Sequence, residues 1–147
     1  MDVRLARDTD ADDVRRLVDE AFTHYIPRIG RKPMPMEADY AELVALGRCW
    51  VVDGDAGLLG MLHLETSDDH LEVVTIAVAP SGQGHGVGGL LLAFADEKAR
   101  ALGLPEVRLC TNEAMTENIA YYPRRGFREV GRSTEQGFKR VFFAKRL

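Results

Sequence analysis

The feature that most constrains this chain is a glycine-rich turn between an apolar strand-like run and an amphipathic helix. The segment APSGQGHGVGGLLLAFADEKARALG, residues 79–103, holds five glycines within eight residues and continues with apolar residues at helical spacing. Glycine lets the backbone adopt left-handed conformations and lets a ligand approach closely. Backbone N–H groups at the start of a helix bind anions such as phosphates. The turn therefore predicts an anion site at the start of this helix.

Two nucleotide-binding motifs compete for this turn. Gly84, Gly86 and Gly89 match G-x-G-x-x-G, but a dinucleotide fold places that motif after the first strand of a repeating strand-helix series, with an acidic residue ending the next strand. Here three strand-like runs precede the turn and the next one ends in Thr-Asn. A phosphate-binding loop of the NTPase kind needs Lys and Ser or Thr after its last glycine, where two leucines stand. We interpret the turn as a pyrophosphate cradle and keep a dinucleotide enzyme as an alternative.

The periodicity of apolar residues predicts a mixed α/β (α+β) fold in the order β-α-α-β-β-β-α-β-α-β-β. The segment Tyr25–Met36 carries three prolines and a glycine and is expected to be a loop with a binding role. Short turns make residues 48–78 an antiparallel meander, and a right-handed crossover makes residues 106–111 parallel to 71–78. Strands are expected at residues 3–6, 48–53, 58–65, 71–78, 106–111, 128–132 and 138–145, and helices at 8–22, 38–46, 87–102 and 116–125, the last with Thr116 as its cap.

Length and composition predict one domain, residues 1–147. No apolar run approaches the roughly 18 to 20 residues that cross a bilayer. The acidic N-terminus is unlike a signal peptide, so we expect a cytoplasmic protein with no membrane partner. Cys49 and Cys110 lie in apolar runs and are expected to be reduced thiols, and neither has the spacing of a metal ligand.

Charge is unevenly distributed along the chain. The net charge of −4 argues against a nucleic-acid partner. Residues 1–75 hold 8 Lys and Arg against 16 Asp and Glu, and residues 76–147 hold the remaining 11 against 7. A basic C-terminal half suits an anionic cofactor, and an acidic N-terminal half suits a cationic acceptor.

Three separated segments together resemble the GNAT superfamily of N-acetyltransferases. They are the strand ending AVAP at Pro80, the string QGHGVG at residues 83–88, and TNEAMTENIAYYPRRGF at residues 111–127. The string fits the superfamily signature of Gln or Arg, two residues, Gly, one residue, and Gly or Ala. The resemblance covers essentially the whole chain. It implies a central sheet of about seven strands, mostly antiparallel with a splayed parallel pair at its centre, flanked by about four helices.

The resemblance also implies acetyl-coenzyme A as co-substrate, with no metal. Amides of the glycine turn would bind its pyrophosphate, and the strand before the turn would pair with its pantetheine arm. Asn118 is a further candidate for a cofactor contact. The cofactor-binding residues implied are Ile76, Ala77, Val78, Gln83, Gly84, His85, Gly86, Val87, Gly88, Gly89 and Asn118.

Acetyl transfer to an amine needs a base for the amine and a proton for the leaving thiolate. Superfamily members often place a tyrosine near the cofactor sulfur, which implies Tyr122 as general acid, with Tyr121 as the fallback. Glu72 is the candidate base, directly or through water, and strand alternation puts it on one face with Val74, Ile76 and Val78. His63 and His70 are competing bases. Pro123 departs from the pattern because it can bend the last helix.

The implied function is transfer of the acetyl group to a primary amine by direct attack in a ternary complex. A route through Cys110 and a non-catalytic coenzyme A-binding sensor are the alternatives. The acceptor is a small-molecule or peptide amine whose identity the sequence leaves open. Small superfamily members often pair through edge strands, so a homodimer is compatible with the resemblance. The substrate-binding residues expected are Tyr25, Arg28, Arg31, Met36, Tyr40 and Phe138.

Overall fold

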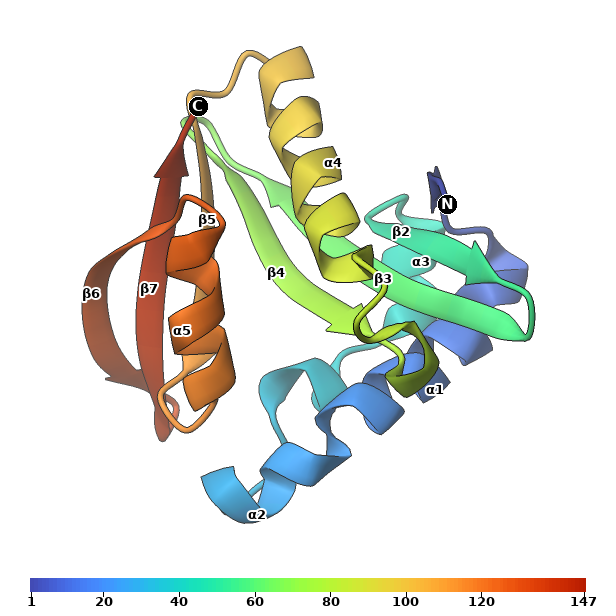
Figure 1. The fold of residues 1–147 in the computed structure, drawn as a ribbon, viewed down its shortest axis with the longest axis horizontal. Coiled ribbons are helices and arrows are strands. Elements are labelled where there is room, and N and C mark those ends of the chain that lie inside the picture. The colour runs from blue at the N-terminus through green and yellow to red at the C-terminus, as the bar shows by residue number, and fades with distance from the viewer.

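A seven-stranded mixed sheet forms the centre of the computed structural model, which describes residues 1–147 (Figure 1). The strand order is β1-β2-β3-β4-β5-β7-β6, and every neighbouring pair is antiparallel except β4 and β5. This arrangement confirms the predicted fold class and the parallel central pair. The strands are β1 Val3–Leu5, β2 Cys49–Gly54, β3 Gly57–Thr66, β4 Leu71–Val78, β5 Glu106–Asn112, β6 Arg128–Glu135 and β7 Phe138–Arg146.

Helices cover both faces of the sheet, and each covered face has its own apolar core. The core against α4 and α5 includes Leu91, Val107 and Phe143. The core against α1 and α3 includes Val18 and Met61. No helix has the length and apolar character needed to cross a membrane. The helices are α1 Ala11–Phe22, α2 Ile26–Ile29, α3 Tyr40–Ala45, α4 Val87–Ala101 and α5 Thr116–Arg124.

Two local expectations are corrected. The segment Tyr25–Met36, expected to be a loop, contains α2 between two short 3₁₀ turns at Thr23–Tyr25 and Met34–Glu37. Its prolines stand at the starts of these turns, where a missing N–H costs no hydrogen bond. Thr116, expected as a cap, is the first helical residue of α5, and its side chain makes no capping bond. We call residues 23–37 the α2 segment.

Strands β4 and β5 diverge after a short paired stretch. Only Leu71, Glu72 and Val73 pair with β5, opposite Val107, Arg108 and Leu109. Beyond these pairs β4 follows β3 while β5 follows β7, and the two halves of the sheet open as a wedge toward the α2 segment (Figure 1). The backbone of β4 beyond Val73 therefore has no strand partner on its β5 side.

A β-bulge in β4 lies at the point where the strands separate. Val73 pairs with Leu64 and Thr75 pairs with His63, which leaves Val74 without a partner on β3. The extra residue reverses the alternation of side chains along the strand. Glu72 therefore faces the same side as Thr75 and not the side of Ile76 and Val78, contrary to the regular alternation expected from the sequence.

The α2 segment is tied across the opening of the wedge to the other half of the sheet. Arg28 Nη1 lies 2.6 Å from Glu117 Oε1 of α5, and the Tyr25 hydroxyl donates to Glu117 Oε2 at 3.3 Å. Arg31 donates to the Gln136 carbonyl at 2.9 Å and stacks on the ring of Phe138 at 4.0 Å from its centroid. The Arg28 guanidinium is the largest influence on the Glu117 carboxyl and lowers its pKa to about 2. These contacts make the α2 segment one wall of the space between β4 and β5.

Gly60 of β3 permits the close approach of α4 to the sheet. A Cβ at this position would lie 2.7 Å from Val87 Cγ1 and 3.0 Å from Leu91 Cδ1, at the start of α4. We therefore expect Gly60→Ala to lower the free energy of unfolding by about 1–3 kcal/mol, the usual cost of overpacking a core. Urea unfolding followed by circular dichroism measures this change.

The matched control is Gly131→Ala in β6, because a Cβ there meets no atom within 4 Å and its φ is not positive. We expect the unfolding midpoint of this control to stay near that of the parent protein. Equal midpoints for the two variants would show that α4 does not depend on the missing side chain at position 60.

Candidate active site

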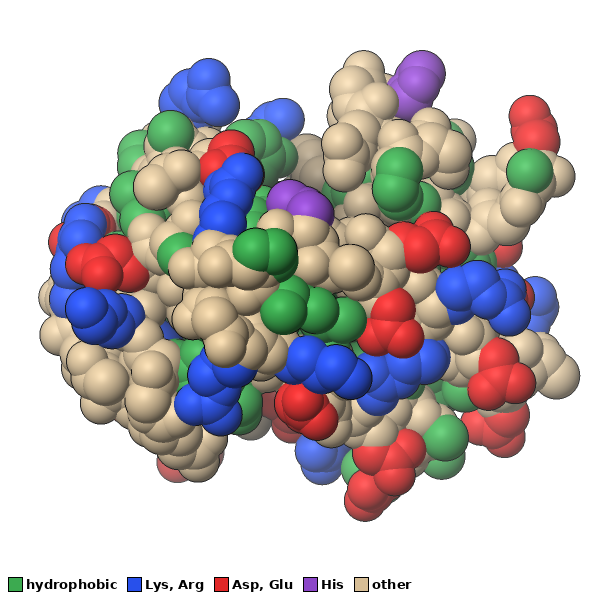
Figure 2. All heavy atoms as spheres, turned by 90° about the horizontal axis from the view of Figure 1, so that it is seen from below, with side chains coloured by type: hydrophobic (Ala, Val, Ile, Leu, Met, Phe, Trp, Pro, Cys, Tyr) green, Lys and Arg blue, Asp and Glu red, His purple; other side chains and the backbone are tan.

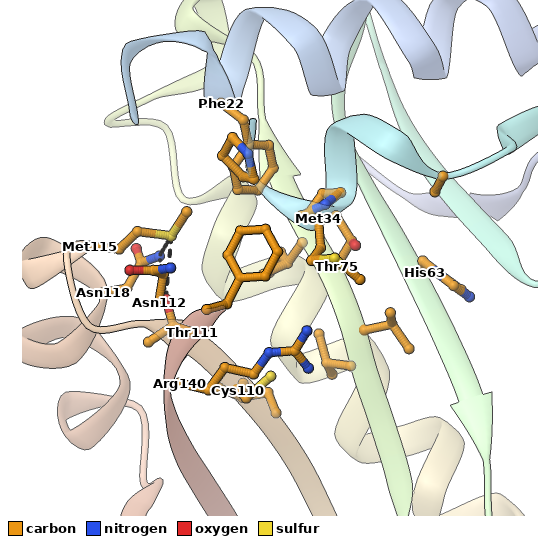
Figure 3. A pocket seen from close by; sticks show the side chains of 18 of the residues that line it. Phe22, Met34, His63, Thr75, Cys110, Thr111, Asn112, Met115, Asn118 and Arg140 are labelled. Carbon is orange, nitrogen blue, oxygen red and sulfur yellow. Dashed lines mark hydrogen bonds between the residues drawn. The ribbon is translucent and has the colours of Figure 1, made fainter. Parts of the chain in front are cut away.

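A cavity of about 440 Å³ occupies the space between β4, β5 and the α2 segment. One side is formed by β4 and by His63 of β3, and the other by β5, α5 and β7. Figure 3 shows Thr75 and His63 on one side and Thr111, Asn118 and Met115 on the other, with Phe22 and Met34 closing the top. The cavity thus lies at the gap where the parallel pair separates.

The glycine turn presents free backbone donors at the start of α4. Gly84 and Gly86 have φ values of 80° and 79°, a left-handed conformation that favours glycine. The N–H groups of Gln83 and His85 bond to carbonyl groups within the turn. The N–H groups of Gly84, Gly86, Val87, Gly88 and Gly89 have no backbone acceptor. Five donors at the positive end of a 15-residue helix suit an anionic group.

Arg125 lies over this turn, although the sequence analysis did not select it. Its guanidinium would be within 2.8–3.0 Å of a Cβ at Gly89, and its Nε donates to the Tyr121 hydroxyl at 3.1 Å. The same hydroxyl would lie 3.2 Å from a Cβ at Gly88. Tyr121 and Arg125 therefore belong to the end of the site formed by the glycine turn. The segment YYPRRGF does not indicate that these two residues contact the glycine turn, because the contact joins residues more than 30 positions apart.

Tyr122, in contrast, reaches the cavity. Its ring packs against Phe127 and Phe143, with centroid distances of 5.8 and 5.7 Å, and only 6% of the residue is exposed. Burial is the largest influence on the phenol and raises its pKa above the usual value for tyrosine. The phenol therefore keeps its proton at neutral pH and can donate it.

Asn118 lies beside Tyr122 in the lining of the cavity. Its amide donates to Thr111 Oγ1 at 3.2 Å and to Met115 Sδ at 3.6 Å. Pro123 occupies the last turn of α5 and does not end the helix before Arg124. The predicted pair Asn118 and Tyr122 is thus brought to one side of the cavity by one turn of helix.

Glu72 enters the cavity lining because the bulge at Val74 turns it toward this side. Its neighbour across the parallel pair, Arg108, binds Glu106 at 2.6 Å and approaches Asp69 at 3.5 Å instead. Its neighbour on β3 is another carboxylate, Glu65. Glu72 therefore has no ion-pair partner in the protein, which leaves its carboxylate available to an incoming ammonium.

The two competing histidines are both held by carboxylates. His63 lines the cavity, but its Nε2 lies 2.5 Å from Glu65 Oε2, and Glu65 also binds Arg48 at 3.1 Å. His70 Nδ1 lies 2.8 Å from Asp69 Oδ1 and is outside the cavity lining.

Of the six residues expected to bind the acceptor, only Phe138 lines the cavity. Tyr25, Arg28 and Arg31 are engaged in the contacts that fix the α2 segment. Tyr40 is 2% exposed and donates to the Pro35 carbonyl at 2.7 Å, and Met36 is buried in the core against α1. These five side chains support the wall of the cavity and do not face into it.

The cavity wall includes residues that the sequence analysis passed over for this role. From the α2 segment they are Ile29, Pro33, Pro35 and Glu37, and from the other half of the sheet Asn112 and Arg140. Burial raises the pKa of the Cys110 thiol at the wall, while the nearby Arg140 acts in the opposite direction. The alternation of β7 places Arg140 on the face of Phe138. Strand alternation together with the position of the cavity would have indicated Arg140, but the sequence does not show the cavity.

The site fits the two parts of a coenzyme A thioester. Free N–H groups and the absent side chains of the glycine turn suit a pyrophosphate, and the unpaired β5-facing side of β4 suits an extended, amide-bearing arm. No group of three or more His, Cys, Asp or Glu side chains is placed to hold a metal ion.

Solved structures with the same fold include several acetyltransferases. The chain is 14% identical to PaiA N-acetyltransferase of Thermoplasma acidophilum in complex with coenzyme A, covering 99% of this chain and 98% of that one with a TM-score of 0.82. It is 30% identical to nourseothricin acetyltransferase over 67% of this chain and 64% of that one, with a TM-score of 0.63.

Sequence comparison gives the family directly. The chain is 33% identical over 90 residues to the uncharacterized N-acetyltransferase YvbK of Bacillus subtilis (strain 168), covering 59% of this chain and 57% of the relative. The model of the acetyltransferase (GNAT) family matches residues 11–127, which include the glycine turn, β4, β5 and α5. The chain therefore belongs to the GNAT family of acetyltransferases.

Proposed function

We propose that the protein transfers the acetyl group of acetyl-coenzyme A to a primary amine by direct attack in a ternary complex. The observation that carries the proposal is the unpaired side of β4 beyond Val73, which runs from a cavity lined by Tyr122 and Glu72 to the strand end that precedes the glycine turn. Acetyl-coenzyme A, when bound, supplies an activated acyl group as a thioester. The protein's own part is to position it, to accept a proton from the amine and to donate one to the thiolate.

The donor site of this proposal consists of backbone groups. The free amides of Gly84 and of residues 86–89 would hold the pyrophosphate, and Ile76, Ala77 and Val78 would pair with the pantetheine arm as an added strand. Arg125 would add a positive charge beside the phosphates, where its guanidinium already covers Gly89. Asn118 would contact the arm from the opposite side of the gap.

The general acid in this proposal is Tyr122. Its phenol is protonated at neutral pH, as that of an ordinary tyrosine is, and its position in the cavity wall is compatible with a donor to the leaving thiolate. Tyr121 suits this role less well, because its hydroxyl accepts a hydrogen bond from Arg125 beside the glycine turn.

The base in this proposal is Glu72, directly or through one water. A carboxylate without an ion-pair partner attracts the ammonium of the acceptor and can receive its proton. Cys110 is a poor nucleophile here because burial raises the pKa of its thiol, which favours direct attack over a covalent route.

Replacing Tyr122 tests the proposed acid. We expect Tyr122→Phe to lower kcat by roughly 10²- to 10⁴-fold, the range for a lost proton transfer, and to leave the Kd of acetyl-coenzyme A nearly unchanged. Turnover is measured by thiol release across a panel of amines, and Kd by calorimetry.

Tyr121→Phe is the matched control, since it removes the neighbouring hydroxyl from the same helix and should lower kcat far less. Equal kcat values for the parent protein and Tyr122→Phe would contradict the assigned acid. Tight binding of coenzyme A with no transfer to any amine would favour a non-catalytic sensor instead.

Replacing Glu72 tests the proposed base. We expect Glu72→Gln to lower kcat/KM for the amine at pH 7 by roughly 10²-fold or more, because the acceptor ammonium then loses its proton acceptor. The loss should shrink at pH 9.5, where more of the amine is already neutral. Initial rates at both pH values, with His63→Asn as the comparison for the competing base, measure this effect. A larger loss for His63→Asn would reassign the base.

A further inference from the structure

The cavity lining contains a cation, Arg140, that the proposed reaction does not use. We propose that the acceptor is a small amine that also carries a carboxylate and an apolar side chain, such as an apolar α-amino acid, and that Arg140 binds its carboxylate. The inference rests on the proposed acetyl transfer and specifies its substrate class.

Arg140 projects into the cavity from near the start of β7, where it pairs with Asn112 of β5 and Ser133 of β6. Its side chain is only 21% exposed. Figure 3 shows its guanidinium extending from β7 toward the side of the cavity where Thr75 lies, with Cys110 close beside it. The charge therefore faces the cavity and not the bulk solvent.

Most of the donors of this guanidinium are unused. A guanidinium has five N–H donors in a planar arrangement. The guanidinium of Arg140 makes one hydrogen bond to an oxygen of another side chain, from Nη1 to Glu135 Oε1 at 3.3 Å. The Cys110 thiol beside it is a weak acceptor. A carboxylate entering the cavity could therefore form a paired, two-point contact with donors that the protein leaves free.

Glu135, the existing partner of Arg140, uses only part of the hydrogen-bonding capacity of the guanidinium. The side chain of Glu135 is 49% exposed at the end of the β6–β7 hairpin, where solvent screens the pair. The contact is long and uses one oxygen. An acceptor without an anionic group would cover the cavity side of the guanidinium and leave its remaining donors without partners, which costs binding energy.

A group of opposite charge lines the same cavity. Glu72 has no ion-pair partner, and Glu72 and Arg140 both act on the Cys110 thiol, so the two charges lie near the same residue. Glu37 of the α2 segment is a second carboxylate in the lining. Seen from below, the surface around the α2 segment also shows acidic and basic side chains interspersed (Figure 2). An acceptor whose ammonium and carboxylate lie close together matches both groups, whereas a polyamine would bring a second ammonium toward Arg140.

Part of the remaining wall is apolar. Its apolar side chains from α1, the α2 segment and β7 are Phe22, Ile29, Pro33, Met34, Pro35 and Phe138. A volume of about 440 Å³ suits a small molecule. These walls favour acceptors with an apolar side chain over short polar ones.

The test compares amino acids with their amides, which differ in the carboxylate alone. We expect kcat/KM for L-phenylalanine, L-leucine and L-methionine to exceed that of the matched amides by about 10- to 100-fold, after correction for the fraction of neutral amine. In Arg140→Gln the values for the amino acids should fall to those of their amides. Arg140→Lys keeps the charge without the two-point geometry and should retain part of the preference.

Arg132→Gln on β6 is the matched control, because Arg132 binds Glu113 and Glu129 and does not line the cavity. It should keep the full preference for amino acids. The urea midpoint of each variant confirms that it is folded, and calorimetry with L-phenylalanine and coenzyme A gives the same comparison without turnover.

The outcomes separate this inference from the proposed function. Equal kcat/KM for amino acids and amides, or better turnover of spermidine than of any amino acid, would overturn the inference and leave acetyl transfer intact. A preference that survives Arg140→Gln would overturn the assignment of Arg140. Failure to acetylate any amine, with coenzyme A bound, would overturn the proposed function itself.

Discussion

The separation of two parallel strands is the constraint on which the rest of the site depends. Strands β4 and β5 share three residue pairs and then diverge, because each follows a different antiparallel neighbour. In a fully paired sheet, the backbone of β4 would have no free edge, and Tyr122 would lie behind a closed layer. In the proposed reaction, this opening would admit the donor from the α4 side and the acceptor from the α2 side. Packing of α5 on β7, through Tyr122 and Phe143, supports one side of this opening.

The charged groups of the site depend on details within that frame. The bulge at Val74 directs Glu72 into the cavity, and the competing pairs of Arg108 leave its carboxylate free. The contacts of the α2 segment with Glu117 of α5 hold this segment against the other half of the sheet, beside the cavity. Burial against Phe127 and Phe143 raises the pKa of the Tyr122 phenol. The proposed acid and the proposed base thus lie on opposite sides of one gap, in different local environments.

The sequence predicted most of the order of elements, the parallel pair and the glycine turn before α4, because these depend on local periodicity, on the handedness of crossovers and on glycine. It could not reveal the bulge, since one extra residue at Val74 leaves the pattern of apolar residues looking regular. It also assigned Tyr25 and Arg28 to the acceptor, because their partner, Glu117, lies about 90 positions away. Arg140 was missed for a similar reason. An arginine in a strand can be assigned to a cavity only when the other elements that line the cavity are known.

The central claim is that a coenzyme A thioester occupies the opening between β4 and β5 and rests on the glycine turn. Hydrogen exchange with and without acetyl-coenzyme A, read by mass spectrometry, tests it directly. We expect slower exchange in peptides covering residues 74–89, where free amides of the turn and the unpaired edge of β4 would gain acceptors, and no comparable change in β6. Binding of acetyl-coenzyme A that leaves exchange in residues 74–89 unchanged would contradict the account.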